Sequence, residues 1–144
     1  MKPYFLDTSA LVKQYRTEQG TERVQALFDD QQNALFISEL TIVEYTSTLQ
    51  CLKSQGEITA EAMSNARGNF DNDADGRFVI IGLRGEFIKE AKTLVLQHNL
   101  RTLDALQLTS ALSFKILSPT FVSADGDLLK AAQASGLTTL NPLE

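Results

Sequence analysis

The sequence predicts an α/β protein, in which a parallel sheet of four to five strands is covered by helices on both faces. Short apolar segments, rich in Phe, Val, Ile and Leu, alternate along the chain with longer segments of helical periodicity. The chain has 144 residues, of which 43% are hydrophobic, and contains no internal repeat and no dividing linker. We therefore expect a single domain over residues 1–144 with one sizeable core.

The first half of the chain is expected to form two strands and four helices. Gly56 is a good helix terminator, because glycine adopts the left-handed conformation that follows many helices. The acidic segment DNDADG is expected to be a loop, since Asn and Asp tolerate unusual backbone angles. The expected strands are 3–7 and 34–38, the helices are 8–16, 21–30, 39–56 and 58–70, and the loop is 71–76.

The second half is expected to add three strands and three helices. Ligands of parallel sheets bind beyond the carboxyl ends of the strands, so residues that directly follow a strand are candidates for a functional site. The expected strands are 77–82, 120–124 and 137–140, and the expected helices are 86–99, 102–116 and 125–136.

Composition excludes several classes of protein. No apolar run is long enough to span a membrane, and the amino terminus lacks a secretory pattern, so we expect a cytoplasmic protein. The single cysteine, Cys51, excludes an internal disulfide and a multi-cysteine zinc site, and the single histidine, His98, excludes a histidine cluster. Any metal must therefore be held mainly by oxygen. The net charge of −5 argues against a broad basic surface, unless several acids are gathered in one cation site.

The segment 71–76 resembles the first half of an EF-hand calcium loop, with acids at loop positions 1, 3 and 5 and Gly76 at position 6. Such a loop ends in a bidentate glutamate at position 12, where this chain has Gly82. The residues after Gly76 also predict a strand rather than an exiting helix. We interpret this segment as a polar turn without a calcium site.

Four scattered acids form a better candidate site. Asp7 ends the first predicted strand, Asp125 follows the fourth, Asp104 lies in the first turn of a helix, and Glu44 lies in mid-helix. Taken singly, the three aspartates could also be helix caps. Glu44 has no basic residue three or four positions away to pair with and lies in a helix that is apolar on two sides, which favours a metal or another partner.

Together, these carboxylates could hold one or two hard divalent cations such as Mg²⁺ or Mn²⁺, which prefer oxygen ligands. Mutual repulsion among four acids would favour cation binding. Such an ion lowers the pKa of a bound water and polarises phosphoryl oxygens. The residues therefore predict metal-dependent hydrolysis of phosphodiester bonds.

Four segments then show a resemblance. In this order and spacing they resemble the PIN-domain ribonucleases, specifically the VapC-type toxins of bacterial and archaeal toxin–antitoxin pairs. The resemblance covers nearly the whole chain. The segments are FLDTSALVK (5–13), SELTIVEY (38–45), LDALQLTSAL (103–112) and FVSADGDLLKAA (121–132), the last followed by GLTTLNP (136–142).

The resemblance implies a three-layer α/β/α fold and a Mg²⁺- or Mn²⁺-dependent endoribonuclease. It implies an RNA substrate, a homodimer and a small antitoxin whose tail enters the active-site groove, with helix surfaces at 40–52 and 58–70 as candidate docking faces. The implied metal ligands and catalytic residues are Asp7, Glu44, Asp104 and Asp125; the implied supporting hydroxyls are those of Thr8, Ser9 and Ser123.

The segment after Asp125 departs from the family pattern. Gly126 and Asp127 follow Asp125, where relatives commonly have basic or polar residues. Asp127 is either a fifth ligand or a helix cap, and a possible phosphate contact is lost. Positive charge for RNA would then come from elsewhere, with Lys13, Arg16 and Arg101 as candidates.

Other enzyme classes fit less well. A phosphate-accepting receiver domain needs an aspartate after the third strand, where this chain has IIGLRG, and a haloacid-dehalogenase-type phosphatase needs D-x-D where it has DTS. The alternative that stays open is a non-catalytic PIN-like scaffold that binds RNA or protein. The presence of all four acids argues against it.

Overall fold

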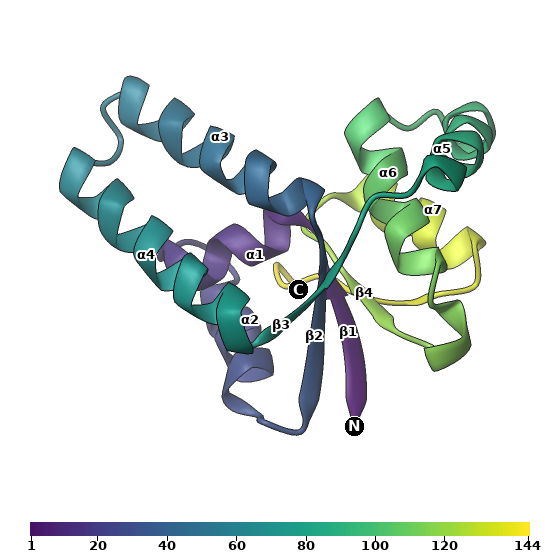
Figure 1. The fold of residues 1–144 in the computed structure, drawn as a ribbon, viewed down its shortest axis with the longest axis horizontal. Coiled ribbons are helices and arrows are strands. Elements are labelled where there is room, and N and C mark those ends of the chain that lie inside the picture. The colour runs from purple at the N-terminus through teal and green to yellow at the C-terminus, as the bar shows by residue number, and fades with distance from the viewer.

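The computed structural model describes residues 1–144 and contains one five-stranded sheet in which every neighbouring pair of strands is parallel. The strand order is β3-β2-β1-β4-β5. This architecture confirms the predicted parallel α/β fold (Figure 1). The strands are β1 (Lys2–Leu6), β2 (Asn33–Ser38), β3 (Phe78–Ile81), β4 (Thr120–Val122) and β5 (Thr138–Leu140).

Helices cover both faces of the sheet (Figure 1). The first four pack on one face and the last three on the other. The helix expected over 102–116 ends earlier, at Leu112, and is followed by a short 3₁₀ helix, Lys115–Leu117. The helices are α1 (Thr8–Tyr15), α2 (Thr21–Asp29), α3 (Leu40–Ser54), α4 (Ala60–Gly76), α5 (Gly85–His98), α6 (Thr102–Leu112) and α7 (Gly126–Ala134).

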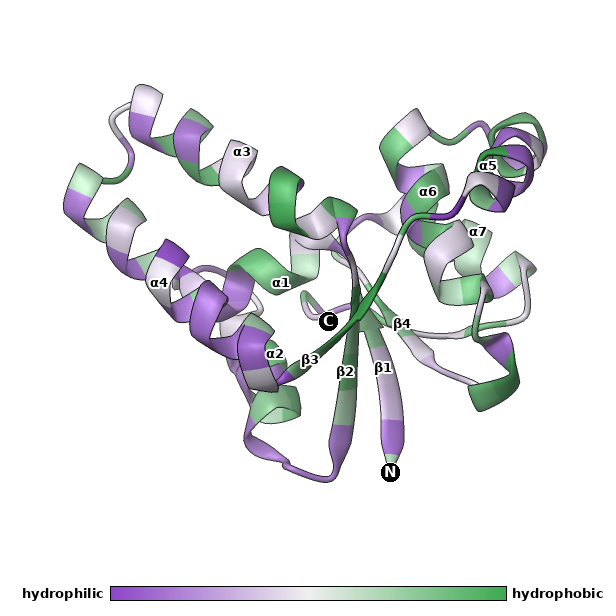
Figure 2. Ribbon diagram, viewed as in Figure 1, coloured by the Kyte–Doolittle hydropathy of each residue, from purple (hydrophilic) through white to green (hydrophobic).

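Side chains that point alternately to the two faces of the sheet contribute to two hydrophobic cores, one on each face. Phe5 and Phe121, whose ring centroids are 5.5 Å apart, point toward α5, α6 and α7. Their neighbours in sequence, Leu6 and Val122, point to the opposite face, toward α1 to α4. Successive side chains of a strand face opposite sides, so a strand buried on both faces must be apolar throughout. Figure 2 shows hydrophobic residues along β2 and β3, whereas α4 is mostly hydrophilic.

The acidic segment 71–76 is helical, so the predicted loop is wrong. It forms the last turns of α4, which runs to Gly76. Phe70 and Ala74 pack on the core, and the Asp73 carboxylate accepts a hydrogen bond of 2.6 Å from the Tyr15 hydroxyl. These tertiary contacts outweigh the low helix propensity of Asn and Asp.

The bond between Tyr15 and Asp73 leads to a stability prediction. Burial, reinforced by Asp73, raises the pKa of Tyr15, so the phenol stays protonated and donates. We expect Tyr15→Phe to lower the free energy of unfolding by about 1.5–3 kcal/mol, the usual contribution of a hydrogen bond to a charged group. Tyr4→Phe is the control, because the Tyr4 hydroxyl makes no hydrogen bond within the protein. Urea denaturation that finds equal stabilities for the two variants would contradict this role of Asp73.

The topology brings several chain segments to one edge of the sheet. β1 and β4 are neighbours and end side by side, so the residues that follow them, at the starts of α1 and α7, lie close together. β2 ends at the same edge and leads into α3. No helix is both long enough and apolar enough to cross a bilayer.

Candidate active site

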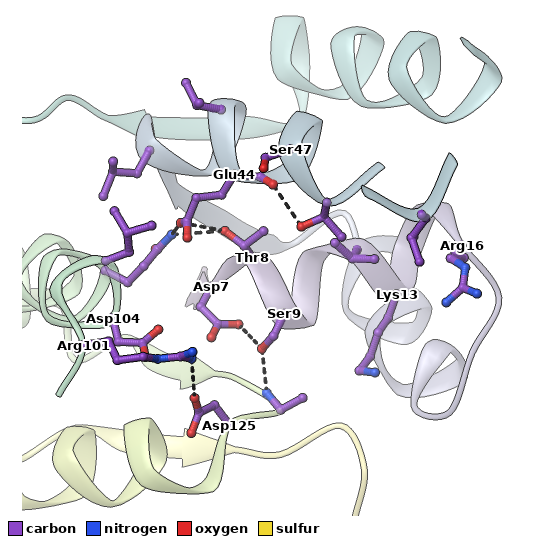
Figure 3. A pocket seen from close by; sticks show the side chains of 18 of the residues that line it. Asp7, Thr8, Ser9, Lys13, Arg16, Glu44, Ser47, Arg101, Asp104 and Asp125 are labelled. Carbon is purple, nitrogen blue, oxygen red and sulfur yellow. Dashed lines mark hydrogen bonds and ion pairs between the residues drawn. The ribbon is translucent and has the colours of Figure 1, made fainter. Parts of the chain in front are cut away.

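A cavity of about 700 Å³ opens at this edge (Figure 3). The four acids singled out by the sequence all line it, although they come from four different parts of the chain. Thr8 and Ser9 also line the cavity, whereas Ser123 lies buried beneath it and Asp127 lies outside, exposed to solvent. The four carboxylates are those of Asp7, Glu44, Asp104 and Asp125.

Asp7 is the most buried of the four acids, with only 4% of its surface exposed. It caps α1: its Oδ1 accepts hydrogen bonds from Ala10 N at 2.9 Å and from Ser9 Oγ at 2.7 Å. Its Oδ2 accepts a bond of 2.6 Å from Ser123 Oγ. Burial raises the pKa of Asp7 to about 6, the three hydrogen bonds oppose that rise, and the nearby charge of Asp104 adds to it. Occupancy of this site by a cation would relieve the cost of a buried charge.

Glu44 is held through one oxygen only. Its Oε1 accepts hydrogen bonds from Thr8 Oγ1 at 3.0 Å and from Gln107 Nε2 at 2.7 Å, and its Oε2 has no partner in the protein. The adjacent hydroxyls of Thr8 and Ser9 therefore serve different carboxylates. Gln107 was missed by the sequence reasoning. A usable signal was its spacing of three residues from Asp104, which puts both on one face of the helix.

Arg101 lies between the remaining two acids (Figure 3). Its Nε is 3.2 Å from Asp104 Oδ2, and its Nη2 is 3.8 Å from Asp125 Oδ2. Asp125 also caps α7, since its Oδ1 accepts hydrogen bonds from the backbone N–H groups of Asp127 and Leu128. Capping leaves Asp125 Oδ2 directed to the cavity, so the same residue can be both a cap and part of the site.

The donor groups of the cavity fit a hard cation. They are carboxylates and hydroxyls, with no cysteine or histidine among the lining residues, and this is the donor set that Mg²⁺ and Mn²⁺ prefer. In the conformation described, no three acidic, cysteine or histidine side chains are close enough together to hold one ion. The guanidinium of Arg101 is the positive group that Asp104 and Asp125 share here.

The other two expected RNA contacts are already paired. Lys13 is buried, and its Nζ lies 2.9 Å from Glu18 Oε1, while Arg16 Nη1 lies 3.0 Å from Glu18 Oε2. Arg16 also reaches Glu57 at 3.5 Å. Both basic residues line the cavity, but Glu18 offsets much of their charge. The Arg101 side chain is 83% exposed and is the most accessible of the three candidates.

Comparisons with known proteins agree with this architecture. The family model described as PIN domain matches residues 4–134. A search of curated proteins found no significant match. Among solved structures, PAE2754 of Pyrobaculum aerophilum is 20% identical, with a TM-score of 0.70 over 96% of this chain and 83% of that one.

Two further structures have similar folds. VapC20 of Mycobacterium tuberculosis, described as a toxin that cleaves the sarcin–ricin loop, is 14% identical with a TM-score of 0.67, covering 94% of this chain and 96% of that chain. VapBC2 of Rickettsia felis, bound to a promoter DNA fragment, has 16% identity and a TM-score of 0.64, covering 96% of this chain and 97% of that chain. At these identities the likeness shows a common fold.

Proposed function

Given that the chain belongs to the PIN-domain family, we propose that it is a metal-dependent endoribonuclease that hydrolyses RNA phosphodiester bonds. The observation that supports this most is the cavity at the edge of the sheet, which is lined by four carboxylates from distant parts of the sequence. The structural likeness to a toxin that cleaves the sarcin–ricin loop adds support for RNA as the substrate class.

In this proposal the four carboxylates bind the cation, and neighbouring hydroxyl groups orient the carboxylates. Asp7, Glu44, Asp104 and Asp125 would hold Mg²⁺ or Mn²⁺, which when bound lowers the pKa of a water and polarises the scissile phosphate. The hydroxyls that donate to Asp7 favour its charged form and fix its orientation. Glu44 Oε2, which has no protein partner, is available to accept a hydrogen bond from a water in the cavity.

RNA would enter along the cavity that these acids line. Arg101 is the exposed cation beside Asp104 and Asp125, and it is suited to contact a phosphate of the substrate. Aliphatic side chains form another part of the wall, among them Leu40, Val43 and Leu103. Asp127, exposed in the first turn of α7 with its own N–H bonded to Asp125, is assigned no role as a ligand.

We further propose that the chain is a VapC-type toxin. Similar folds occur in toxin–antitoxin complexes, including one from Klebsiella pneumoniae with 18% identity and a TM-score of 0.64, which makes a small antitoxin the expected partner. A homodimer is proposed from the family. Exposed apolar residues are available for such contacts on α3, β3 and α5, among them Val43, Val79 and Ile88.

The test is cleavage of RNA by the purified protein. We expect cleavage with Mg²⁺ or Mn²⁺, its loss on chelation and its recovery when the cation is restored. Single-stranded DNA of the same sequence serves as the substrate control. RNA binding without cleavage at any cation concentration would instead favour the non-catalytic scaffold, and full cleavage in chelator would contradict the metal-dependent mechanism.

A further inference from the structure

Gln107 lies on α6, one turn after Asp104, and is almost fully buried, with 2% of its surface exposed. Its Nε2 is within hydrogen-bonding distance of three oxygens from two other helices. These are Glu44 Oε1 at 2.7 Å, Thr41 Oγ1 at 2.9 Å and Thr8 Oγ1 at 3.2 Å. Gln107 therefore joins α6 to α1 and α3 at the floor of the cavity.

The orientation of the Gln107 amide follows from its neighbours. If the amide were reversed, its oxygen would lie against the Glu44 carboxylate with no hydrogen between them, so the nitrogen must face Glu44. The amide oxygen then has no hydrogen-bond partner, although it is buried. An unsatisfied buried polar group costs about 1–3 kcal/mol, which a leucine or methionine at this position would avoid. Packing alone does not account for glutamine here.

We propose that Gln107 is a positioning residue for Glu44. By holding Oε1 together with Thr8, it fixes the carboxylate and leaves Oε2 free of protein partners, so that this oxygen would be available to a cation. The inference rests on the proposed function, and it adds a residue that acts through Glu44 rather than on the substrate. Groups that orient a metal ligand in this way typically change metal affinity 10–100-fold when removed.

The experiment measures binding of Mn²⁺ to the purified full chain by calorimetry, without RNA. Gln107→Met keeps the length of the side chain and removes the donor, and we expect about 10–100-fold weaker Mn²⁺ binding. The variant should fold, because it also removes the unsatisfied amide oxygen. If it does not, Gln107→Asn, which keeps an amide but is one methylene shorter, is expected to show the same weakening.

Thr109→Val is the matched control. Thr109 lies on the same helix, is fully buried and has an unpartnered Oγ1, but it does not line the cavity. Its substitution should leave Mn²⁺ affinity unchanged. A second arm combines Gln107→Met with Glu44→Gln. If Gln107 acts through Glu44, the double variant binds Mn²⁺ as weakly as Glu44→Gln alone. If the two residues act independently, the losses of binding free energy caused by the two substitutions add.

The outcomes separate this inference from the function on which it rests. If the wild-type protein binds Mn²⁺, but no more tightly than Gln107→Met does, the inference alone is overturned. Additive losses of Mn²⁺ affinity in the double variant overturn it as well. Wild-type protein that binds no Mn²⁺ overturns the proposed function and, with it, the role of Gln107.

Discussion

Asp7→Asn is expected to reduce RNA cleavage at least about 1000-fold, the scale of loss seen when a central catalytic group is removed, while the fold is retained. Asparagine can still cap α1, because its carbonyl oxygen can accept the hydrogen bonds now donated by Ser9 Oγ and Ala10 N. What is lost is the negative charge, together with the acceptor that Oδ2 offers to Ser123 Oγ. The measurement is cleavage rate in saturating Mn²⁺, beside circular dichroism to verify the fold.

Stability provides the control for this variant. The pKa of Asp7 is raised to about 6 from 3.8, chiefly by burial, so the folded state binds the proton more tightly than the unfolded state does. Without a divalent cation, stability should therefore fall as pH rises from about 4 to about 6. At about 1.4 kcal/mol per pKa unit, the free energy of unfolding should fall by at most about 3 kcal/mol.

Asp7→Asn lacks this titration, so in chelator it should be more stable than the wild type at pH 7.5, and the difference should shrink below pH 5. Urea denaturation at both pH values measures it. A variant that cleaves RNA normally would contradict the assignment of Asp7. A wild type that gains stability relative to the variant between pH 5 and 7.5 would contradict the burial argument.

The second large effect is expected at Asp125, where two roles can be separated. Asp125→Asn keeps a good helix cap and removes the charge, whereas Asp125→Ala removes both. We expect both variants to lose cleavage at least about 100-fold, the scale of a lost electrostatic contact in an active site. Only the alanine variant should also lose stability, by about 1 kcal/mol.

Cleavage rates and urea denaturation of the pair give the comparison directly. Normal cleavage by Asp125→Asn together with lower stability of Asp125→Ala would mean that the residue is a cap alone. The structure permits both roles at once, since Oδ1 receives the backbone bonds of α7 while Oδ2 faces Arg101 and the cavity.

Most of the fold could be predicted because it follows from local pattern. Apolar strands such as β2 and amphipathic helices such as α5 have periodicities that fix their type, and alternation of strand and helix implies a parallel sheet. The loop predicted for 71–76 failed because the deciding interactions are tertiary: Asp73 bonds to Tyr15, and Phe70 packs in the core. Propensity alone contains no information about either contact.

The acids of the candidate site could be predicted in part, because their positions follow from the order of strands and helices along the chain. Acids that follow strands of a parallel sheet must meet at one edge, so Asp7 and Asp125 could be placed from sequence order alone. Gln107 shares a helix face with Asp104, but its contacts could not be predicted, because its partners Glu44 and Thr8 are 63 and 99 positions away in the sequence. The pairing of Lys13 with Glu18 likewise depends on a turn whose geometry the sequence pattern does not specify.

The proposed mechanism requires that the four carboxylates hold a divalent cation in one cavity. Anomalous scattering from crystals equilibrated with Mn²⁺, at a concentration that supports cleavage, tests it most directly. We expect an anomalous peak among Asp7, Glu44, Asp104 and Asp125, and its absence from crystals of Asp7→Asn. No peak in this cavity, or a peak that persists unchanged in the variant, would contradict it.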